Sequence, residues 1–515
     1  MRLFALFRLI HGAVVMARRG VFSYAPAADL PPAARFGVAL ARLLERRDAH
    51  GTDAAQRLTI ALNRLGPSYV KLGQFLATRP DVVGREAAAD LSRLQDQVPA
   101  VPDAAARAVV EEALGRPVEV AFLSFGPAVA AASIAQVHRA EVIGRDGEPM
   151  AVAVKVLKPG VAGRFARDLE SFYLAARLIE RFVPSARRLR PVAVVDTLAR
   201  SIELEMDLRL EAAAMSEMAE NTGEDPGFRL PEVDWSHTAK SVLTMEWIDG
   251  IRPSQRQAII DAGHDPKALA AVIVQSFLRH AMRDGFFHAD MHQGNLFVVA
   301  DGTLVAVDLG ITGRLNLAER RFLAEILYGF IRRDYRRVAE VHFEAGYVPA
   351  GYDVEVFAQA LRAIGEPIRD QTARDISMAR LLTQLFEVTE LFAMRTQPRL
   401  ILLQKTMVVV EGVARALDPE LDIWRTAEPV VSDWILRNLG PVGRIEAFGS
   451  GLSALARLAA DLPALADRVH AAAYADGEEA ERRRVEAARQ DRSRTRAAWL
   501  AALALVAIAV AVAVG

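Results

Sequence analysis

The spacing of apolar residues divides the chain into helical and strand-forming stretches. Between residues 35 and 120 apolar side chains recur with the period of a helix, as in FGVALARLLERR and YVKLGQFLATRP, and Arg79-Pro80 closes the second segment. From about Pro127 the pattern becomes strand-like. The segments ASIAQVHRAEVI and MAVAVKVLKP flank a turn at 144–148, which predicts a β-hairpin. Residues 163–220 return to long charged helices.

A second strand-rich region follows these helices. SVLTMEWIDGI has a strand pattern, ALAAVIVQSFLRHAMRDG a helical one, and FFHADMHQGNLFVVADGTLVAVDLG that of short strands separated by polar turns. Helices follow to the end, including an amphipathic segment at 451–473. We therefore predict an α+β, predominantly helical chain in which a helical extension precedes a small β-rich lobe, a hinge and a helical lobe. This is the order of a two-lobed protein-kinase-like fold.

Composition narrows the functional classes. The formal net charge is −1, so no overall field favours nucleic acid, and we expect no nucleic-acid partner. The chain has no cysteine, which excludes disulfides, thiolate metal sites and cysteine nucleophiles. Its hydrophobic content of 52% is high for a soluble protein.

The last nineteen residues, 497–515, contain no charged side chain. As a helix they extend roughly 28 Å, close to the hydrocarbon core of about 30 Å, and Trp499 suits a membrane interface. We predict a single transmembrane helix here, a buried helix being the alternative. The positive-inside rule then places the body in the cytoplasm, at the inner membrane of a bacterial-type cell, because the preceding segment is rich in arginine: Arg482, Arg483, Arg484, Arg489, Arg492, Arg494 and Arg496.

The first residues, MRLFALFRLIHGAVVMARRGVF, are basic and apolar. Arg8 interrupts the apolar run and no small-residue cleavage site follows, which argues against a signal peptide. Two interpretations remain open: an amphipathic helix lying on an anionic membrane, and an ordinary helix docked on the protein.

Four polar residues have the order needed to bind a nucleotide. Lys155 lies in the alternating strand AVAVKV, like the phosphate-binding lysine strand of kinases. In HADMHQGN, Asp290 is followed five residues later by Asn295, the interval of a kinase catalytic loop, and Asp308 comes thirteen residues after that. Asn295 and Asp308 offer the hard oxygen ligands that Mg²⁺ prefers. We therefore expect an ATP and Mg²⁺ site with Asp290 as the base or the water-orienting group.

A zinc interpretation of the same loop takes His288 and His292 as ligands, but it lacks the glutamate of HExxH and lies on a turn. We expect His288 and His292 instead to support the loop, His288 by hydrogen bonds. The carboxylates of Glu205, Asp207 and Glu211 cannot share one face of a continuous helix, and a solvated helix surface explains them without further chemistry.

Several of these motifs together resemble the UbiB/ABC1/ADCK (aarF) family of atypical kinase-like proteins, which are linked to ubiquinone biosynthesis. The resemblance runs from about Leu65 to Asp422 and is carried by LGPSYVKLGQFLATRPDVV, AAASIAQVHRAEV with VAVKVLKPG, LEMDLRLEAAAM, FFHADMHQGNLFV, VAVDLGITGRL and LLQKTMVVVEGVARALDPELD. Two departures, Ala135 in place of a common glycine and Leu309 in place of a common phenylalanine, remove no charged group.

The resemblance implies further roles. Glu211 would be the partner of Lys155, while Glu205 and Asp207 match a motif that interacts with the substrate-occluding KxGQ helix (Lys71, Gly73 and Gln74) and with the metal region. An alanine-rich loop would replace the glycine-rich loop of kinases, and the residues assigned to ATP binding beside Lys155 and Glu211 are Ala130, Ala131, Ala132, Ser133, Glu246 and Ile248. ATP and Mg²⁺ are the expected cofactors.

The predicted organisation has six parts: a basic segment at 1–34, the helical extension at 35–125, a kinase-like N-lobe with inserted helices at 126–250, a C-lobe at 251–440, amphipathic and arginine-rich helices at 441–496, and the membrane helix at 497–515. Expected partners are membrane lipid, isoprenoid quinone precursors, other quinone-biosynthesis proteins and a second copy of the chain as a homodimer. Protein kinase, small-molecule kinase of the aminoglycoside type, and nucleotide-switched lipid-binding scaffold are the alternatives to an ATPase.

Overall fold

The computed structural model describes residues 2–21, 54–77, 99–182, 190–369 and 398–440, together with a few isolated residues between them. The chain divides into two units, Met1–Trp434 and Ile435–Gly515. The predicted helix FGVALARLLERR, the amphipathic and arginine-rich segments at 441–496 and the membrane helix at 497–515 lie outside the described residues, apart from the single residue Glu45. Within the described part of the chain, no helix is long and apolar enough to cross a bilayer.

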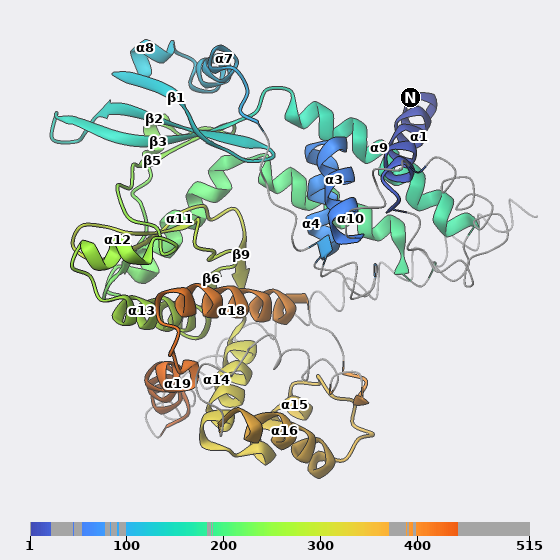
Figure 1. Cartoon of the computed structure of the whole chain (residues 1–515), viewed down its shortest axis with the longest axis vertical. Coiled ribbons are helices and arrows are strands. Elements are labelled where there is room, and N and C mark those ends of the chain that lie inside the picture. The colour runs from blue at the N-terminus through green and yellow to red at the C-terminus, as the bar shows by residue number, and fades with distance from the viewer. Residues whose placement is uncertain are drawn as a thin grey trace, which may run out of the picture. The chain divides into compact units, whose positions relative to one another are not determined.

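A four-stranded antiparallel sheet forms the first half of the kinase-like region (Figure 1). Its strands are β1 (Ser124–Ala131), β2 (Ala135–Ile143), β3 (Pro149–Leu157) and β5 (Val242–Glu246), in the order β1-β2-β3-β5. The predicted hairpin is confirmed, because β2 and β3 pair without interruption along their whole length. Alternation along β3 then sends its valines to one face of the sheet and Lys155 to the other.

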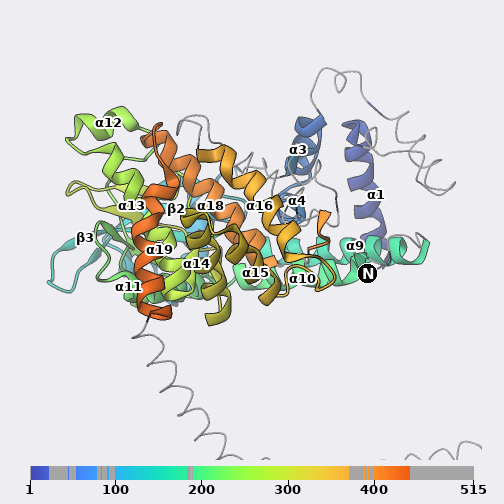
Figure 2. The same cartoon turned by 90° about the horizontal axis from the view of Figure 1, so that it is seen from below.

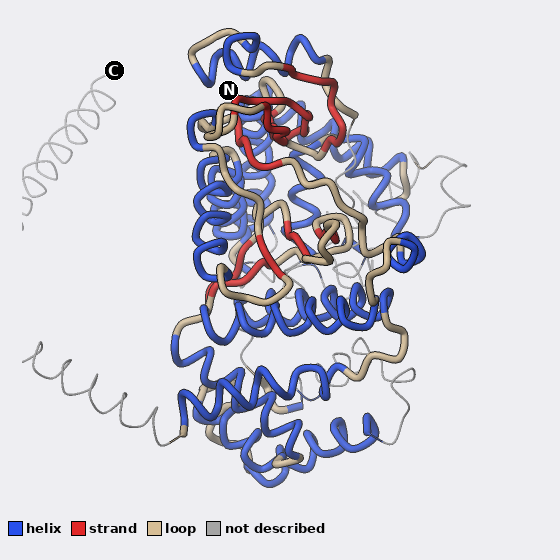
Figure 3. Tube along the Cα trace, turned by 90° about the vertical axis from the view of Figure 1, so that its left-hand side faces the viewer, coloured by secondary structure: helices blue, strands red, loops and turns tan. Residues whose placement is uncertain are grey.

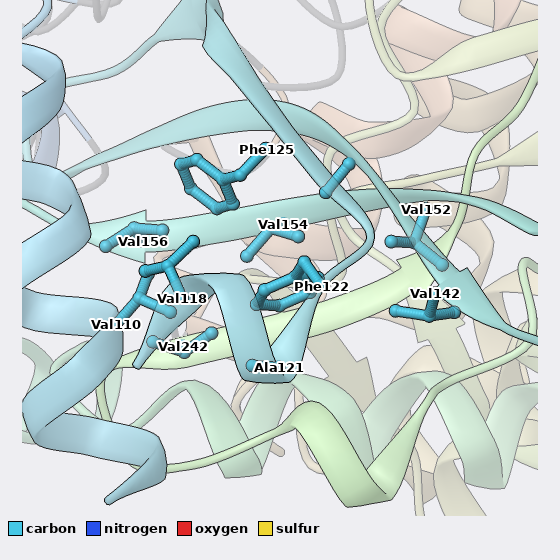
Figure 4. Packing of buried hydrophobic residues seen from close by; sticks show 11 residues of the cluster. Val110, Val118, Ala121, Phe122, Phe125, Val142, Val152, Val154, Val156 and Val242 are labelled. Atoms are coloured by element: carbon cyan, nitrogen blue, oxygen red, sulfur yellow. The ribbon is translucent and has the colours of Figure 1, made fainter. Parts of the chain in front are cut away.

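The valine face of the sheet is covered by α7 (Asp103–Leu114) and α8 (Val118–Ala121). Figure 4 shows Phe122, at the end of α8, among these side chains. The cluster consists of Val110, Val118, Ala121, Phe122, Phe125, Ala140, Val142, Val152, Val154, Val156 and Val242. The two helices, which the sequence analysis grouped with the N-terminal extension, therefore belong to the core of the sheet.

Helices α9 (Val161–Phe182), α10 (Pro191–Glu205) and α11 (Leu208–Thr222) follow β3. The extension contributes α1 (Arg2–Arg18), α3 (Ala54–Leu65) and α4 (Pro67–Ala77), and both Figure 1 and Figure 2 show α1 beside α9. Arg8 of α1 forms an ion pair with Glu170 of α9 at 3.1 Å, and Tyr69 of α4 meets Phe172 edge to face at 5.0 Å between ring centres.

One face of α1 is therefore docked on the protein, as the second interpretation of the N-terminus expects. Other side chains of α1 are apolar and exposed, including Phe4 and Phe7. Docking through Arg8 and contact of Phe4 and Phe7 with lipid are compatible, and the lipid contact stays a prediction.

The second half of the kinase-like region begins with β4 (Phe228–Arg229), the short 3₁₀ turn Trp235–His237 and α12 (Arg256–Asp261). Helix α13 (Pro266–Arg279) continues into a π-helical turn, His280–Asp284, which Gly285 ends at φ 65°. Four short strands follow: β6 (Phe286–His288), β7 (Leu296–Val298), β8 (Leu304–Ala306) and β9 (Thr312–Arg314).

These strands form two small sheets, β4-β8-β7 and β6-β9, which lie between the large sheet and the long helices (Figures 1 and 3). The helices are α14 (Leu317–Arg332), α15 (Tyr335–Glu344), α16 (Val354–Arg369), α18 (Pro398–Leu417) and α19 (Ile423–Leu439). Helix α18 packs along α13. The short strands between polar turns are present as predicted, and the loop after β8 brings Asp308 to Lys155 of the large sheet.

Replacing Phe122 by alanine should lower the free energy of unfolding by ~3–5 kcal/mol, because its ring fills the space between α8 and the sheet. The matched control is Val120→Ala, two residues earlier in the same short helix: Val120 is 69% exposed, whereas Phe122 is 3% exposed. Thermal and urea unfolding of both variants checks this. Equal losses for the two substitutions would contradict the proposed packing.

Candidate functional site

Lys155 lies at the centre of an ion-pair cluster. Its Nζ donates to both carboxylate oxygens of Glu211, at 2.8 and 2.9 Å, and to Oδ1 of Asp308 at 2.9 Å. Lys155 comes from β3, Glu211 from the first turn of α11, and Asp308 from the loop after β8. Three segments far apart in the sequence therefore meet at one ammonium group.

The charges of the cluster depend on one another. Burial opposes the charge on Lys155, but the carboxylates of Asp308 and Glu211 outweigh it and raise the pKa of the ammonium. The Lys155 ammonium holds the pKa of Asp308 well below its usual range, against the effect of burial. Burial raises the pKa of Glu211 to about 7, although Lys155 acts in the opposite direction. Asp308 is thus ionised at neutral pH, while both oxygens of Glu211 accept from Lys155 although burial makes this carboxyl a weaker acid than usual.

The acidic motif before Glu211 spans a helix break. Glu205 is the last residue of α10, and Asp207 caps α11 by accepting from the backbone N–H of Arg209 at 3.2 Å. The expectation of a single continuous helix is therefore wrong, because the chain turns at Met206 and the capping aspartate starts a new helix there. The break lets the three carboxylates of the motif point to different partners.

Those partners differ in kind. Glu205 forms an ion pair with Lys71 of α4 at 2.7 Å, so the helix that contains Lys71, Gly73 and Gln74 is joined to the acidic motif. Asp207 instead binds the guanidinium of Arg209, at 2.9 and 2.7 Å, and this contact lowers its pKa. The expected contact of the motif with Lys71 is present, whereas Asp207 is engaged with Arg209 rather than with the metal region.

The loop after β6 is fixed by two histidines. Nε2 of His288 donates to the carbonyl of Val307 at 3.1 Å, and its Nδ1 accepts from the backbone N–H of Asp290 at 3.1 Å, which requires a neutral ring. Burial lowers the pKa of His288 and so favours this form. Nδ1 of His292 accepts from the backbone N–H of Gly294 at 2.9 Å.

The histidine contacts leave the zinc interpretation without support. Both rings are used by the loop itself, and within the described ranges no group of three or more His, Cys, Asp or Glu side chains is placed to hold a metal ion. The expected role of His288 in supporting the loop is present in the structure.

Asn295 and Asp308 are brought together through their backbones. The N–H of Val307, which precedes Asp308, donates to the carbonyl of Asn295 at 2.9 Å. Nδ2 of Asn295 donates to the carbonyl of Asp290 at 3.1 Å, so its amide oxygen is directed away from that bond. Asp308 adopts a φ of 63°, a left-handed conformation that few non-glycine residues take. An amide oxygen and a carboxylate are a donor set that fits Mg²⁺.

The alanine-rich segment is only partly a loop. Ala130 and Ala131 are the last residues of β1, so the expectation that both belong to the loop is wrong: they continue the ladder to β2, and the turn itself begins at Ala132. The hydroxyl of Ser133, in the turn, is buried and makes no hydrogen bond.

Glu246 and Ile248, which the sequence analysis assigns to ATP binding, lie where the large sheet leads into the second half. Glu246 ends β5, and its carboxylate binds the guanidinium of Arg229 at 2.7 and 2.9 Å. Ile248 follows two residues later, outside the strand. The Glu246 side chain thus has a structural partner of its own.

Two residues that sequence reasoning missed hold parts of the site. Lys158 donates from Nζ to the carbonyl of Ala132 at 2.6 Å, and the hydroxyl of Thr406 on α18 donates to the carbonyl of Ala289 at 3.1 Å. Both side chains bind backbone carbonyls of residues distant in the sequence. The spacing of residue types along the chain does not predict such contacts.

Comparisons with known proteins agree with this architecture. Residues 93–342 match the ABC1 atypical kinase-like domain, and residues 361–422 match the UbiB helical domain. A relative from Marinobacter nauticus, named "Probable protein kinase UbiB", is 40% identical over 90% of this chain and 84% of its own length. One of the same name from Azotobacter vinelandii is 40% identical over 81% of this chain and 78% of its own length.

Among solved structures, the complex of Rv3197 with erythromycin from Mycobacterium tuberculosis is similar. Its sequence identity to this chain is 26%, its TM-score is 0.47, and the match covers 73% of this chain and 95% of that one.

His288 should make the stability of the protein depend on pH. Because burial lowers its pKa, the unfolded chain takes up a proton first, and stability falls as pH drops below about 6.5. His288→Asn keeps an acceptor for the Asp290 N–H but cannot titrate. Melting temperatures measured from about pH 8 to pH 5 should fall more steeply in the wild type than in this variant. Parallel curves would contradict the neutral, buried histidine, since all other groups are common to both proteins.

Proposed function

The chain belongs to the UbiB family of ABC1 atypical kinase-like proteins, and from this premise we propose that it binds Mg-ATP and hydrolyses it in support of isoprenoid quinone biosynthesis. The observation that carries the proposal is the Lys155 ammonium held between Glu211 and Asp308. A lysine oriented by a glutamate, beside an aspartate and an asparagine that can hold metal, is the arrangement that phosphoryl-transfer sites use.

Each residue has a defined task in this proposal. Lys155 binds phosphate oxygens, and Glu211 keeps its ammonium charged and oriented. The carboxylate of Asp308 and the amide oxygen of Asn295 would hold Mg²⁺, which neutralises charge on the phosphates when bound. Asp290, whose backbone is fixed by His288, orients a water molecule or accepts its proton.

The turn after β1 should make phosphate placement unlike that of ordinary kinases. Glycine-rich loops bring backbone N–H groups close to phosphate because glycine lacks a Cβ and readily adopts positive φ. Here the equivalent turn contains Ala132 and Ser133, which restrict both. We propose that this turn, with Ala130, Ala131, Glu246 and Ile248, shapes the nucleotide site and its preference among nucleotides.

The proposal includes a location. The uncharged segment 497–515 and the arginines before it suit a single membrane anchor with the body in the cytoplasm. Membrane lipid and quinone precursors are then the expected partners, because both reside in the bilayer.

A second candidate is phosphoryl transfer to a protein, which the printed name of the two relatives favours. The ion pair between Lys71 and Glu205 argues against transfer to a protein. It attaches α4, the helix that the resemblance describes as substrate-occluding, to the segment that carries Glu211. Incubation with γ-labelled ATP separates the candidates: label appearing in a defined protein or hydroxylated metabolite at the rate of ATP consumption favours a kinase, and label released only as phosphate favours an ATPase.

Asp308→Asn should weaken Mg-ATP binding by about 100-fold or more, because the variant loses a charged metal ligand. Asp290→Asn, the matched control in the neighbouring loop, should bind Mg-ATP with a Kd within about twofold of that of the wild type. Its rate of ATP hydrolysis should fall by a factor of ~10²–10⁴. Titration calorimetry and phosphate release with liposomes present provide the two readouts. Full Mg-ATP affinity in the Asp308 variant would refute the metal assignment.

Deleting the gene should lower cellular isoprenoid quinone, and re-expression of the wild type should restore it while Asp308→Asn should not. Quinone extracted from the strains and measured by chromatography checks this. A normal quinone level in a clean deletion strain would contradict the role in quinone biosynthesis. It would not contradict the proposed Mg-ATP site.

A further inference from the structure

Lys158 connects the alanine-rich turn to a distant segment of the chain. It is 8% exposed, and its Nζ donates to the carbonyl of Ala132 at 2.6 Å and to that of Pro99 at 3.0 Å. Its own backbone N–H donates to the carbonyl of Ile134 at 2.8 Å. The side chain and the backbone of one residue thus hold both ends of the turn.

The turn is also closed from within, because the N–H of Ala132 donates to the carbonyl of Ala135 at 2.9 Å. Ala135 pairs with Leu157 and Val137 pairs with Lys155. The turn therefore adjoins the part of the sheet that carries Lys155. The position of the turn is therefore set relative to Lys155 by the β2–β3 ladder on one side and by Lys158 on the other.

Pro99 belongs to a short segment, Pro99–Val101, that leads from the N-terminal extension into α7. A second buried side chain holds this segment. Oε1 of Gln136 accepts from the N–H of Val101 at 2.8 Å, and Nε2 of Gln136 lies 3.4 Å from the carbonyl of Val101. Gln136 is 1% exposed, and its side chain contacts Val101 and His138, whereas the ammonium of Lys158 joins the segment to the turn.

We propose that Lys158 is a positioning residue that fixes the Ala132–Ala135 turn against Pro99–Val101 and thereby sets how tightly the site binds nucleotide phosphates. The inference rests on the proposed Mg-ATP site. The physical reason is that one buried ammonium donates to two carbonyl oxygens at once, so its loss would leave both without that donor and release the turn. Glycine makes the equivalent turn of kinases flexible. Here Lys158, which follows the last residue of β3, holds the turn in place.

The test compares three variants by hydrogen exchange of the full-length protein without nucleotide. Lys158→Met keeps the length of the side chain and removes the donor, and Lys158→Arg keeps a charged donor. Gln136→Met releases Val101 and also removes the contact of Gln136 Nε2 with Nε2 of His138 at 2.9 Å, but it leaves both bonds of the Lys158 ammonium in place. We expect Lys158→Met to accelerate exchange at the amides of residues 132 and 158 by about tenfold or more, and Gln136→Met to accelerate it at Val101 but not at Ala132. Lys158→Arg should restore most of the protection at the turn.

Nucleotide affinity is measured on the same proteins. Lys158→Met should raise the Kd for Mg-ATP by about fivefold to twentyfold, whereas Gln136→Met should leave it within about twofold of wild type. Equal weakening by the two methionine variants would overturn the proposal, since Lys158 would then act only through general stability. Unchanged exchange at the turn in Lys158→Met, or in Lys158→Gln if the methionine variant does not fold, would overturn it as well.

The two proposals fail in different ways. A wild-type protein that does not bind Mg-ATP refutes the proposed function, and with it the effect of Lys158 on nucleotide. The exchange data still decide whether Lys158 holds the turn. A wild type that binds Mg-ATP while Lys158→Met shows faster exchange and unchanged Kd refutes the further inference alone.

Discussion

One ammonium group, that of Lys155, determines how the surrounding elements must be arranged. It is shared by the carboxylates of Glu211 and Asp308, and removing either partner of the buried Lys155–Glu211 pair would leave an unpaired charge inside the protein. The pleat of β3 must direct Lys155 away from the valine core, and α11 must begin close enough for its first turn to present Glu211. Asp308 must adopt a left-handed conformation to direct its carboxylate toward the same point. Each of these local features brings one of the three charged groups within hydrogen-bond distance of its partner.

The N-terminal extension is joined to this centre at two places. Lys71 on α4 pairs with Glu205, six residues before Glu211, and the segment after the extension is held by Lys158 and Gln136. The helix break at Met206 makes the first connection effective, because it allows Glu205 to face α4 while Glu211 faces Lys155. Displacement of α4 would therefore act on the end of α10 and, across one short turn, on the glutamate that orients Lys155.

The features that depend on short-range patterns in the sequence could be predicted. The β2–β3 hairpin and the short strands around Asp290 follow from alternation and turn residues, and the order of Lys155, Asp290, Asn295 and Asp308 follows from intervals within loops. The break at Met206 was missed, although Asp207 is a good capping residue, because the apolar period continues across it. The contacts of Lys158 with carbonyl groups could not be predicted, since they join backbone atoms brought together only by the fold.

Charge balance at the centre bears on how the proposed site would hold metal and nucleotide. With all three groups ionised, the two carboxylates exceed the single ammonium by one negative charge, and burial responds by raising the pKa of Glu211 to about 7. In the proposed Mg-ATP site, a nucleotide bound without metal would add further negative charge beside Glu211 and Asp308. A divalent cation held by Asp308 and Asn295 would offset that charge. Asp308 would then contact both the metal and the ammonium of Lys155, to which its carboxylate is already bonded at 2.9 Å.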